Sequence, residues 1–406
     1  MKQTASDNTL KAAVAPGESV SIWSRSFIIL FFANMAFNMG LNMSNSLLSL
    51  YASELGATAA IIGLVYSSFG ISSIVFRMFA APVMDTYNRK YLVVLAALMM
   101  SAAFWGFSAA TGIPMLVGFR LLQGCGMVFG NACCLAMVSE MLPKHKYNSG
   151  IGYYSLAQVI CTAAGPSIGL ELVALAGFRV TYMVAACFML VAGLLTCLIK
   201  TDFTRTKTLK LRLDSIIAKE ALLPAGFQFL MIFAGAGVFS FLYLYAGYKG
   251  ITGNIGLYFT VSAITMLVTR PLVGRLTDKF GLVKIVIPAV FCSALSLFVI
   301  SWSASLIGLL LAAFIAAFGQ GAFGPAIQAL TMKSVPNERR GAASSTNFVA
   351  QDLGALIGPT ITGRLVESFG YNTMWQVMVV PYILGALLLF LFRSKIAHIE
   401  EAFYTR

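Results

Sequence analysis

Four asparagines lie three or four residues apart in one long apolar run, at Asn34, Asn38, Asn42 and Asn45. A helix turns by about 100° per residue, so these side chains fall within about 80° of one another on one face. An amide facing hydrocarbon leaves its donors and acceptors unpaired, which costs several kcal/mol. The face therefore meets protein or water. Interhelical hydrogen bonding would explain it, and so would a cavity that binds polar groups of a substrate, which is the interpretation we favour.

Two ionisable residues, Arg120 and Asp352, also fall inside apolar runs. A carboxyl deep in hydrocarbon is costly unless it is paired or protonated, and it is a functional candidate for that reason. Desolvation favours the neutral form, so Asp352 could bind and release a proton. A structural ion pair with an arginine or a helix-end dipole is the alternative. Arg120 could regulate proton coupling, bind an anion or have a structural role.

Other reactive side chains form no recognisable site. The seven cysteines lie in apolar runs without the CxxC or Cys/His spacing of a metal site. No GxxxxGK[ST] phosphate-binding loop occurs. We therefore expect no metal, no cofactor and no direct use of ATP. A membrane-embedded enzyme would also need a cluster of catalytic groups at membrane depth, and none is evident.

The composition places the chain in a lipid bilayer. Of its 406 residues, 59% are hydrophobic and 11% are charged, against roughly 25% charged in soluble domains. The mean hydropathy is +0.83. The first apolar run, over about 26–50, is too long for a signal peptide. Windows of about 20 apolar residues predict twelve transmembrane helices.

These spans divide the chain into five parts. We expect a tail over 1–24, six-helix bundles over 25–199 and 223–393, a central loop over 200–222 and a second tail over 394–406. All but four of the 28 basic residues fall on one side of this arrangement. Such a bias places both termini and the central loop in the cytoplasm, in a protein of the inner (cytoplasmic) membrane. The positive charge thus reports topology, and we expect no nucleic-acid partner.

The two six-helix halves are related in sequence. One constant offset aligns Arg77 with Arg270, Asp85 with Asp278, Gln158 with Gln351, and Gly165-Pro166 with Gly358-Pro359. Chance apolar similarity would repeat Leu, Ala and Val instead. A parallel duplication of six membrane helices is the architecture of transporters that rock two bundles around a central site.

Four segments resemble signatures of the major facilitator superfamily. The family's loop pattern G-x-L-x-D-R-x-G-R-K is similar to APVMDTYNRK over 81–90, where Ala81 and Asn88 replace glycines, and to RPLVGRLTDKFG over 270–281. RLLQGCG over 120–126 resembles the family's R-x-x-Q-G-x-G element. AAGPSIG over 163–169 resembles the glycine-proline element of the family's antiporters, although a simple packing kink would also explain it.

The resemblance implies an all-α membrane fold of two pseudo-symmetric six-helix bundles, in which the first and seventh helices line a central cavity. We expect kinks at Gly165, Pro166, Gly358 and Pro359. The charges that resemble the family's cytoplasmic gate are Asp85, Arg89, Glu140, Arg275, Asp278, Glu338 and Arg339, or else these are only solvated loop charges. The substrate-binding candidates are Asn34, Asn38, Asn42, Asn45, Gln158, Gln228, Tyr245 and Gln351, with Asp352 and Arg120 for proton coupling.

The predicted function is secondary active export of a small polar or amphiphilic molecule by alternating access, with protons as the antiported ion. A proton symporter, importer or uniporter of a small metabolite is the alternative, and an enzyme or receptor belongs to a different class. A receptor or channel would not require duplicated gate loops. The expected partners are a small-molecule substrate, protons and the lipid bilayer, and the chain is expected to act as a monomer.

Overall fold

The structure is a computed structural model, and it describes residues 23–142, 147–201, 217–336 and 339–404. Within these ranges the secondary structure is helical and no strand occurs. The first half contains α1 (Arg25–Glu54), α2 (Ala59–Thr86), α3 (Arg89–Ser108), α4 (Ile113–Met141) and α5 (Tyr147–Cys197). The second half contains η3 (Lys219–Ala221), α6 (Leu222–Tyr248), α7 (Leu257–Phe280), α8 (Leu282–Trp302), α9 (Leu306–Lys333), α10 (Arg340–Val377), α11 (Val379–Leu391) and α12 (Arg393–Tyr404).

The described chain crosses a membrane twelve times. Ten of its segments are long and apolar enough to span one. Two of these, Tyr153–Cys197 and Ala342–Leu391, have 45 and 50 residues, which is enough for two spans each. They reverse direction at Gly177 (φ 77°) and Gly370 (φ 79°), in a backbone region that favours glycine. The twelve-helix membrane fold predicted from the sequence is therefore confirmed.

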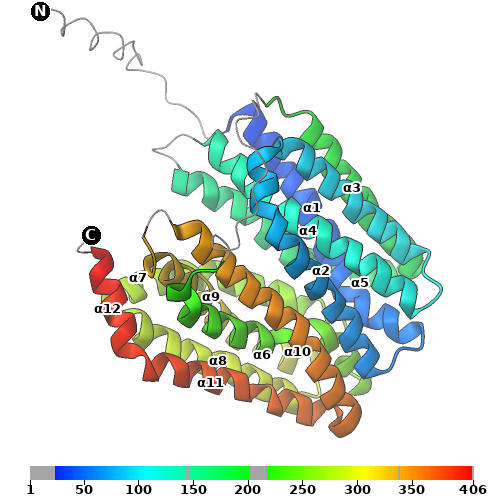
Figure 1. Cartoon of the computed structure of the whole chain (residues 1–406). Helices are drawn as coiled ribbons and strands as arrows, with labels where there is room; N and C mark the ends of the chain where they lie inside the picture. Colours follow the sequence, from blue (N-terminus) through cyan, green and yellow to red (C-terminus); the bar gives the residue numbers. More distant parts are fainter. Residues whose placement is uncertain (1–22, 143–146, 202–216, 337–338, 405–406) are drawn as a thin grey trace, which may run out of the picture.

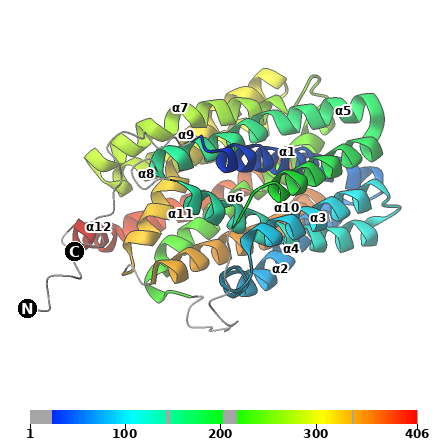
Figure 2. The same cartoon turned by 90° about the horizontal axis from the view of Figure 1, so that it is seen from above.

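The helices form two bundles that lie side by side. Figure 1 shows α1 to α5, in blue to green, as one bundle and α6 to α12, in green to red, as the other. Within the first bundle α5 packs on α1 and α3, and within the second α8 packs on α9 and α6 on α10. Between the bundles, α2 packs along α10 and α5 along α7. Figure 2 gives the same arrangement seen from above.

The halves are joined most closely at the end of the molecule where α1 is connected to α2, here called the Gly56 end. Ser67 and Thr360 are hydrogen-bonded across the α2–α10 contact at 2.7 Å. In the α5–α7 contact, the Thr260 hydroxyl donates to the Ala163 carbonyl at 2.5 Å. Glycine permits this approach, because a Cβ atom at Gly63 would overlap the Pro359 carbonyl.

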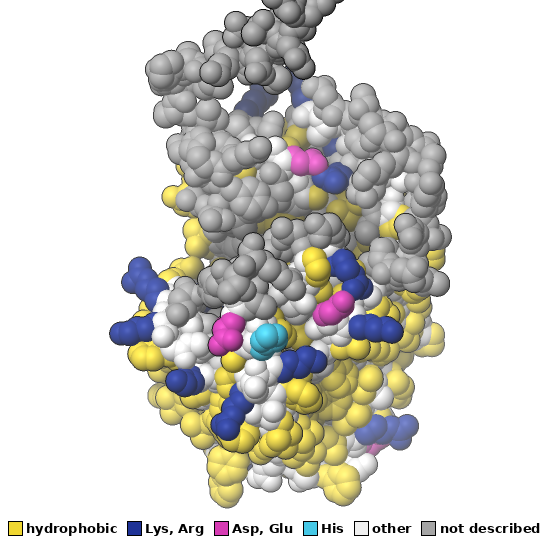
Figure 3. Space-filling model, turned by 60° about the vertical axis from the view of Figure 1, so that its left-hand side comes forward, with side chains coloured by type: hydrophobic (Ala, Val, Ile, Leu, Met, Phe, Trp, Pro, Cys, Tyr) yellow, Lys and Arg dark blue, Asp and Glu magenta, His cyan; other side chains and the backbone are white. Residues whose placement is uncertain are grey.

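The opposite end carries α12 and is called the α12 end. Among the described residues, no hydrogen bond joins the two halves nearer to this end than the contact of Arg77 with Asp352. Figure 3 shows the surface at the α12 end. Lys and Arg side chains are spread over this surface, and hydrophobic side chains cover the flanks below it. The range expected as a C-terminal tail thus contains a helix, α12. Much of the expected central loop, 202–216, lies outside the described residues.

The charge bias predicts that the α12 end faces the cytoplasm. Single cysteines introduced at Gly56 or Gly112, in a variant without native cysteines, should react with a membrane-impermeant maleimide added to intact cells. A cysteine at Thr206 should react only after the membrane is permeabilised. Labelling of Thr206 in sealed, right-side-out vesicles would show that the orientation is inverted.

Candidate functional site

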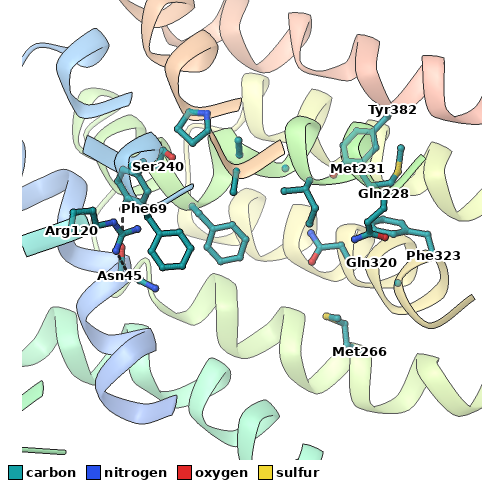
Figure 4. Close-up of a pocket in the computed structure, with 18 residues that line it drawn as sticks. Asn45, Phe69, Arg120, Gln228, Met231, Ser240, Met266, Gln320, Phe323 and Tyr382 are labelled. Atoms are coloured by element: carbon teal, nitrogen blue, oxygen red, sulfur yellow. Dashed lines mark hydrogen bonds between the residues drawn. The ribbon is translucent and has the colours of Figure 1, made fainter. Parts of the chain in front are cut away.

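A cavity of about 400 Å³ lies between the two bundles. The first half lines it with residues of α1, α2 and α4, and the second half with residues of α6, α7, α9, α10 and α11. Figure 4 shows the side chains that surround it. Its polar lining consists of Asn45, Arg120, Gln228, Ser240 and Gln320, and most of the other lining residues are apolar or aromatic. Such a lining suits a ligand that has both an apolar body and a polar group.

Arg120 of α4 is the charged residue of this cavity. Its guanidinium donates hydrogen bonds of 2.5 Å to the amide oxygens of Asn45 and Gln123. The guanidinium carbon also lies 4.9 Å from the centre of the Phe69 ring and 5.4 Å from that of Tyr66. The side chain is buried, with 4% of the residue exposed. Arg120 therefore has neutral partners, and no carboxylate among the described residues pairs with it.

The asparagine face of α1 divides between packing and the cavity. Asn34 donates to the Tyr154 carbonyl of α5 at 3.3 Å. Asn38 and Asn42 donate to the carbonyls of Asn34 and Asn38, each at 2.9 Å. Only Asn45 of the four lines the cavity. The reason is that α1 packs along α5, so three turns of the polar face meet a neighbouring helix, and their amides bond to the preceding turn or to α5.

The other predicted ligand residues are also distributed unevenly. Gln228 of α6 lines the cavity. Gln158 of α5 lines an adjoining cavity of about 260 Å³, together with Arg270 of α7. Gln351 lines neither of these two cavities. The expectation that Tyr245 faces the cavity is wrong: it is fully buried in the second bundle, where its hydroxyl donates to the Ile300 carbonyl at 2.8 Å and its ring packs on Trp375.

Asp352 of α10 has an ion-pair partner. The Arg77 guanidinium of α2 donates to its two carboxylate oxygens at 2.5 and 3.1 Å. Only 6% of Asp352 is exposed. The expectation of a lone carboxylate with Arg120 as its regulating charge is therefore wrong in geometry, because Asp352 points across the α2–α10 contact instead. The pair links one half of the protein to the other.

Among the described residues, three of the seven predicted gate charges form ion pairs within their own half. Arg89 at the start of α3 pairs with Glu140 near the end of α4. Arg339 pairs with Glu220 of η3 at 2.6 Å, and both side chains are substantially exposed. Arg275 is exposed and has no ion pair among the described residues. Glu338, and the side chains of Asp85 and Asp278, lie outside the described part of the chain.

The two glycine-proline pairs lie where helices cross closely. A Cβ at Gly165 would lie 2.9 Å from the Cβ of Asn42 in α1, and one at Gly358 would lie 2.6 Å from that of Ala236 in α6. The Tyr243 hydroxyl donates to the Pro166 carbonyl across the halves at 3.5 Å. Pro359 lines the cavity and borders the α2–α10 contact. These positions fit close helix packing.

Several site residues did not emerge from the sequence. Arg77 stood out in the sequence only as the repeat counterpart of Arg270, yet it forms the ion pair between the halves. Tyr66, Phe69 and Phe323 look like ordinary lipid-facing or core aromatics in a sequence. Gln123 and Gln320 occupy similar QG segments in the two halves, and this repetition is the signal that could have identified them. In the described part of the chain, no group of three His, Cys, Asp or Glu residues could hold a metal ion.

Comparison with known proteins identifies the class. The family model of the Major Facilitator Superfamily matches residues 30–254 and 226–403. The multi-drug resistance efflux pump PmrA of Streptococcus pneumoniae is 26% identical over 373 residues, which cover 87% of this chain and 92% of PmrA. The multidrug resistance protein MdtG of Enterobacter lignolyticus is 26% identical over 385 residues, which cover 90% of this chain and 91% of MdtG.

Among solved structures, a POT family transporter in complex with 5-aminolevulinic acid has the same fold. Its TM-score is 0.78 at 13% sequence identity, covering 92% of this chain and 96% of that one. The chain therefore belongs to the Major Facilitator Superfamily. It is a multi-pass membrane transporter and not an enzyme, as the sequence predicted.

The division of the asparagine face gives a testable expectation. Asn45→Ala should weaken substrate binding several-fold, because each lost neutral hydrogen bond contributes about 0.5–1.5 kcal/mol. The double substitution Asn38→Ala, Asn42→Ala should leave affinity within about twofold, since both amides bond within α1. Equilibrium binding to purified variants measures both. A large loss of affinity in the double variant and none in Asn45→Ala would restore the original interpretation of the whole face as a binding surface.

Proposed function

We propose that this transporter exports small amphiphilic molecules across the cytoplasmic membrane by alternating access, in exchange for protons. The observation that carries the proposal is the cavity itself, which both halves line and which is bounded by their close contacts at the Gly56 end. The similarity to PmrA and MdtG, both named as multidrug proteins, supports export. The cavity is complete within one chain, which supports action as a monomer.

The arrangement of contacts supports an inward-facing state. The described hydrogen bonds between the halves lie at the Gly56 end or near mid-length, and the cavity is continued toward the α12 end by the space beside Ser155, Gln158 and Arg270. With the α12 end in the cytoplasm, a substrate would enter from inside or from the inner leaflet. Separation of α2 from α10 and of α5 from α7 would then open the cavity to the outside.

Proton coupling is assigned to the pair of Asp352 with Arg77. In the inward-facing state the Arg77 guanidinium occupies both carboxylate oxygens of Asp352, so formation of this pair would displace a proton carried by Asp352 to the inside. Movement of α2 away from α10 would remove this cation, and a proton taken up from outside would then replace it at the carboxyl. Replacement of Arg77 by a proton at Asp352 would thus accompany the change from the inward-facing to the outward-facing state.

A flux screen tests the proposed function. Purified protein is reconstituted into liposomes, and uptake is measured for a panel of anionic, neutral and cationic amphiphiles and of small polar metabolites, with an imposed pH difference and without it. We expect accumulation of amphiphiles that depends on the pH difference and is lost on adding a protonophore. Uptake that only equilibrates a metabolite, unaffected by pH, would instead identify a uniporter, and uptake with inward proton flow would identify a symporter.

A further inference from the structure

We propose that the central cavity selects amphiphilic anions, and that Arg120 binds the carboxylate or other oxyanion of the transported molecule. This inference rests on the proposed function and specifies its substrate class. Two observations carry it. Arg120 and Arg270 line the two cavities without an acidic partner among the described residues, and Arg120 lies opposite the apolar part of the central cavity.

The guanidinium of Arg120 is buried, and no carboxylate in the described ranges pairs with it. Its hydrogen bonds reach the amide oxygens of Asn45 and Gln123, and its Nε atom is buried with no hydrogen-bond partner. Neither the cavity nor the adjoining one has an Asp or Glu among its lining residues. A buried cation is costly until an anion pairs with it. An oxyanion that enters the cavity would supply that charge and accept the unused Nε hydrogen, in the fork geometry to which arginine is suited.

The buried carboxylate of Asp352 is already paired with another arginine. Asp352 accepts two hydrogen bonds from Arg77, so its negative charge is not available to Arg120. The internal repeat shows that this pairing is asymmetric. The counterpart of Arg77 is Arg270, but the counterpart of Asp352 is Val159. Arg270 therefore lines the adjoining cavity without the acidic partner that the repeat would have placed there.

The two arginines are connected by one continuous lining. Phe239, Met266 and Gln320 border both the central and the adjoining cavity. Arg270 lies nearer to the α12 end, about ten residues before α7 ends there at Phe280, and Arg120 lies deeper, about seven residues after α4 begins at the Gly56 end. An anion that enters from the α12 end would thus meet Arg270 first and Arg120 second, whereas a cation would meet two like charges along the same path.

The rest of the cavity defines the body of the ligand. Figure 4 shows Arg120 and Asn45 on one side of the cavity, and Met231, Phe323 and Tyr382 on the other. A molecule with its oxyanion at Arg120 would extend its apolar part toward these residues of α6, α9 and α11. Gln228 and Gln320 lie on that side and could bond to polar substituents. A small inorganic anion would fill only the Arg120 side.

A matched series of ligands tests the charge preference. The probes are 1-naphthaleneacetate, its neutral amide and the cation 2-(1-naphthyl)ethylamine, with equilibrium binding measured on the protein in nanodiscs. We expect the carboxylate to bind at least tenfold more tightly than the amide or the amine, because a hydrogen bond to a charged group is roughly twice as strong as a neutral one. Absence of carboxylate binding, or affinity no higher than that of the other two, would overturn the proposal.

Variants assign the preference to the arginines. Arg120→Gln should reduce the preference for carboxylate over amide to below about threefold while the amide affinity stays within about twofold, and Arg120→Lys should keep part of it. Arg270→Gln, at an exposed position where folding is less at risk, should lower the carboxylate association rate. Lys284→Gln of α8 removes an equal charge outside both cavities. It should change neither the preference for carboxylate over amide nor the carboxylate association rate. A full anion preference in both Arg120→Gln and Arg270→Gln would contradict the assignment.

These measurements do not require transport or a proton gradient. They can therefore fail while the proposed function stands: pH-driven accumulation of the amine, with no binding of the carboxylate, would support an exporter and overturn its anion selectivity. Conversely, tight carboxylate binding without any flux would support the site and contradict the proposed function.

Discussion

Asp352→Asn should reduce the substrate accumulation driven by a pH difference at least tenfold, while the affinity for substrate stays within about threefold of the wild-type value. The substitution mimics the protonated carboxyl, so no proton can be released when α2 and α10 come together. Arg77 is the partner that would drive that release, through bonds of 2.5 and 3.1 Å. The measurement is substrate uptake into inside-out vesicles after a pH jump, using purified and reconstituted variants. Glu400→Gln, which alters a carboxylate at the α12 end, is the control and should accumulate substrate normally.

A second substitution separates coupling from stability. Removing one partner of a buried ion pair costs about 3–5 kcal/mol, because the other charge remains unpaired. Arg77→Gln alone should therefore lower the melting temperature markedly, and the double variant Arg77→Gln, Asp352→Asn should regain most of that loss. The double variant should still fail to accumulate substrate. If it concentrates substrate against a gradient supplied only by a pH difference, the pair is structural and the coupling group lies elsewhere.

Gly63→Leu should reduce transport at least tenfold without removing the binding site. A Cβ at Gly63 would overlap the carbonyl oxygen of Pro359, and one at Gly363 would overlap the carbonyl of Ala59. These are backbone atoms, which cannot move aside as a flexible side chain can. A larger residue would therefore hold α2 and α10 apart at the Gly56 end, and the protein would favour the outward-facing state. Gly363→Leu, on the other side of the same contact, should have the same effect.

The matched control is Gly118→Leu in α4, where no atom lies within 4 Å of the added Cβ. This variant should transport at the wild-type rate. Reactivity of a cysteine introduced at the Gly56 end, in the α2–α10 contact, should rise in Gly63→Leu and stay unchanged in Gly118→Leu. Wild-type transport by Gly63→Leu would mean that the helices do not need to meet there during the cycle.

The fold followed from the sequence because the physical signals for it are local. Apolar windows define the spans, and repeated polar residues such as Arg77 and Arg270 reveal the duplication. The reversal at Gly177 and Gly370 is also repeated, at positions where a positive φ favours glycine. The helix within the expected C-terminal tail was missed because its composition is polar and its amphipathic pattern is short.

The site was predicted less well, because it depends on which helix faces meet. Helical periodicity places the four asparagines on one face, but it does not say that α5 covers most of that face. In the same way, the depth of Asp352 could be estimated, whereas its pairing with Arg77 depends on the crossing of α2 and α10. Tyr245 was misplaced because an aromatic residue in the seventh span suits the bundle interior as well as the cavity. Arg120 and Gln228 line the cavity, in keeping with side chains too polar to face lipid, and their roles there stay predictions.

Alternating access is tested most directly by distance measurements between spin labels in the two halves. One pair, at Thr58 and Ser368, reports the Gly56 end, and a second pair, at Tyr91 and Lys279, reports the α12 end. In Asp352→Asn, measured at the same pH as the wild type, we expect the first distance to be longer and the second to be shorter, because the substitution removes the ion pair that holds α2 to α10. Glu400→Gln, which leaves this pair intact, should show the wild-type distances at both ends. Distances that stay constant, or that change in the same direction at both ends, would contradict the account.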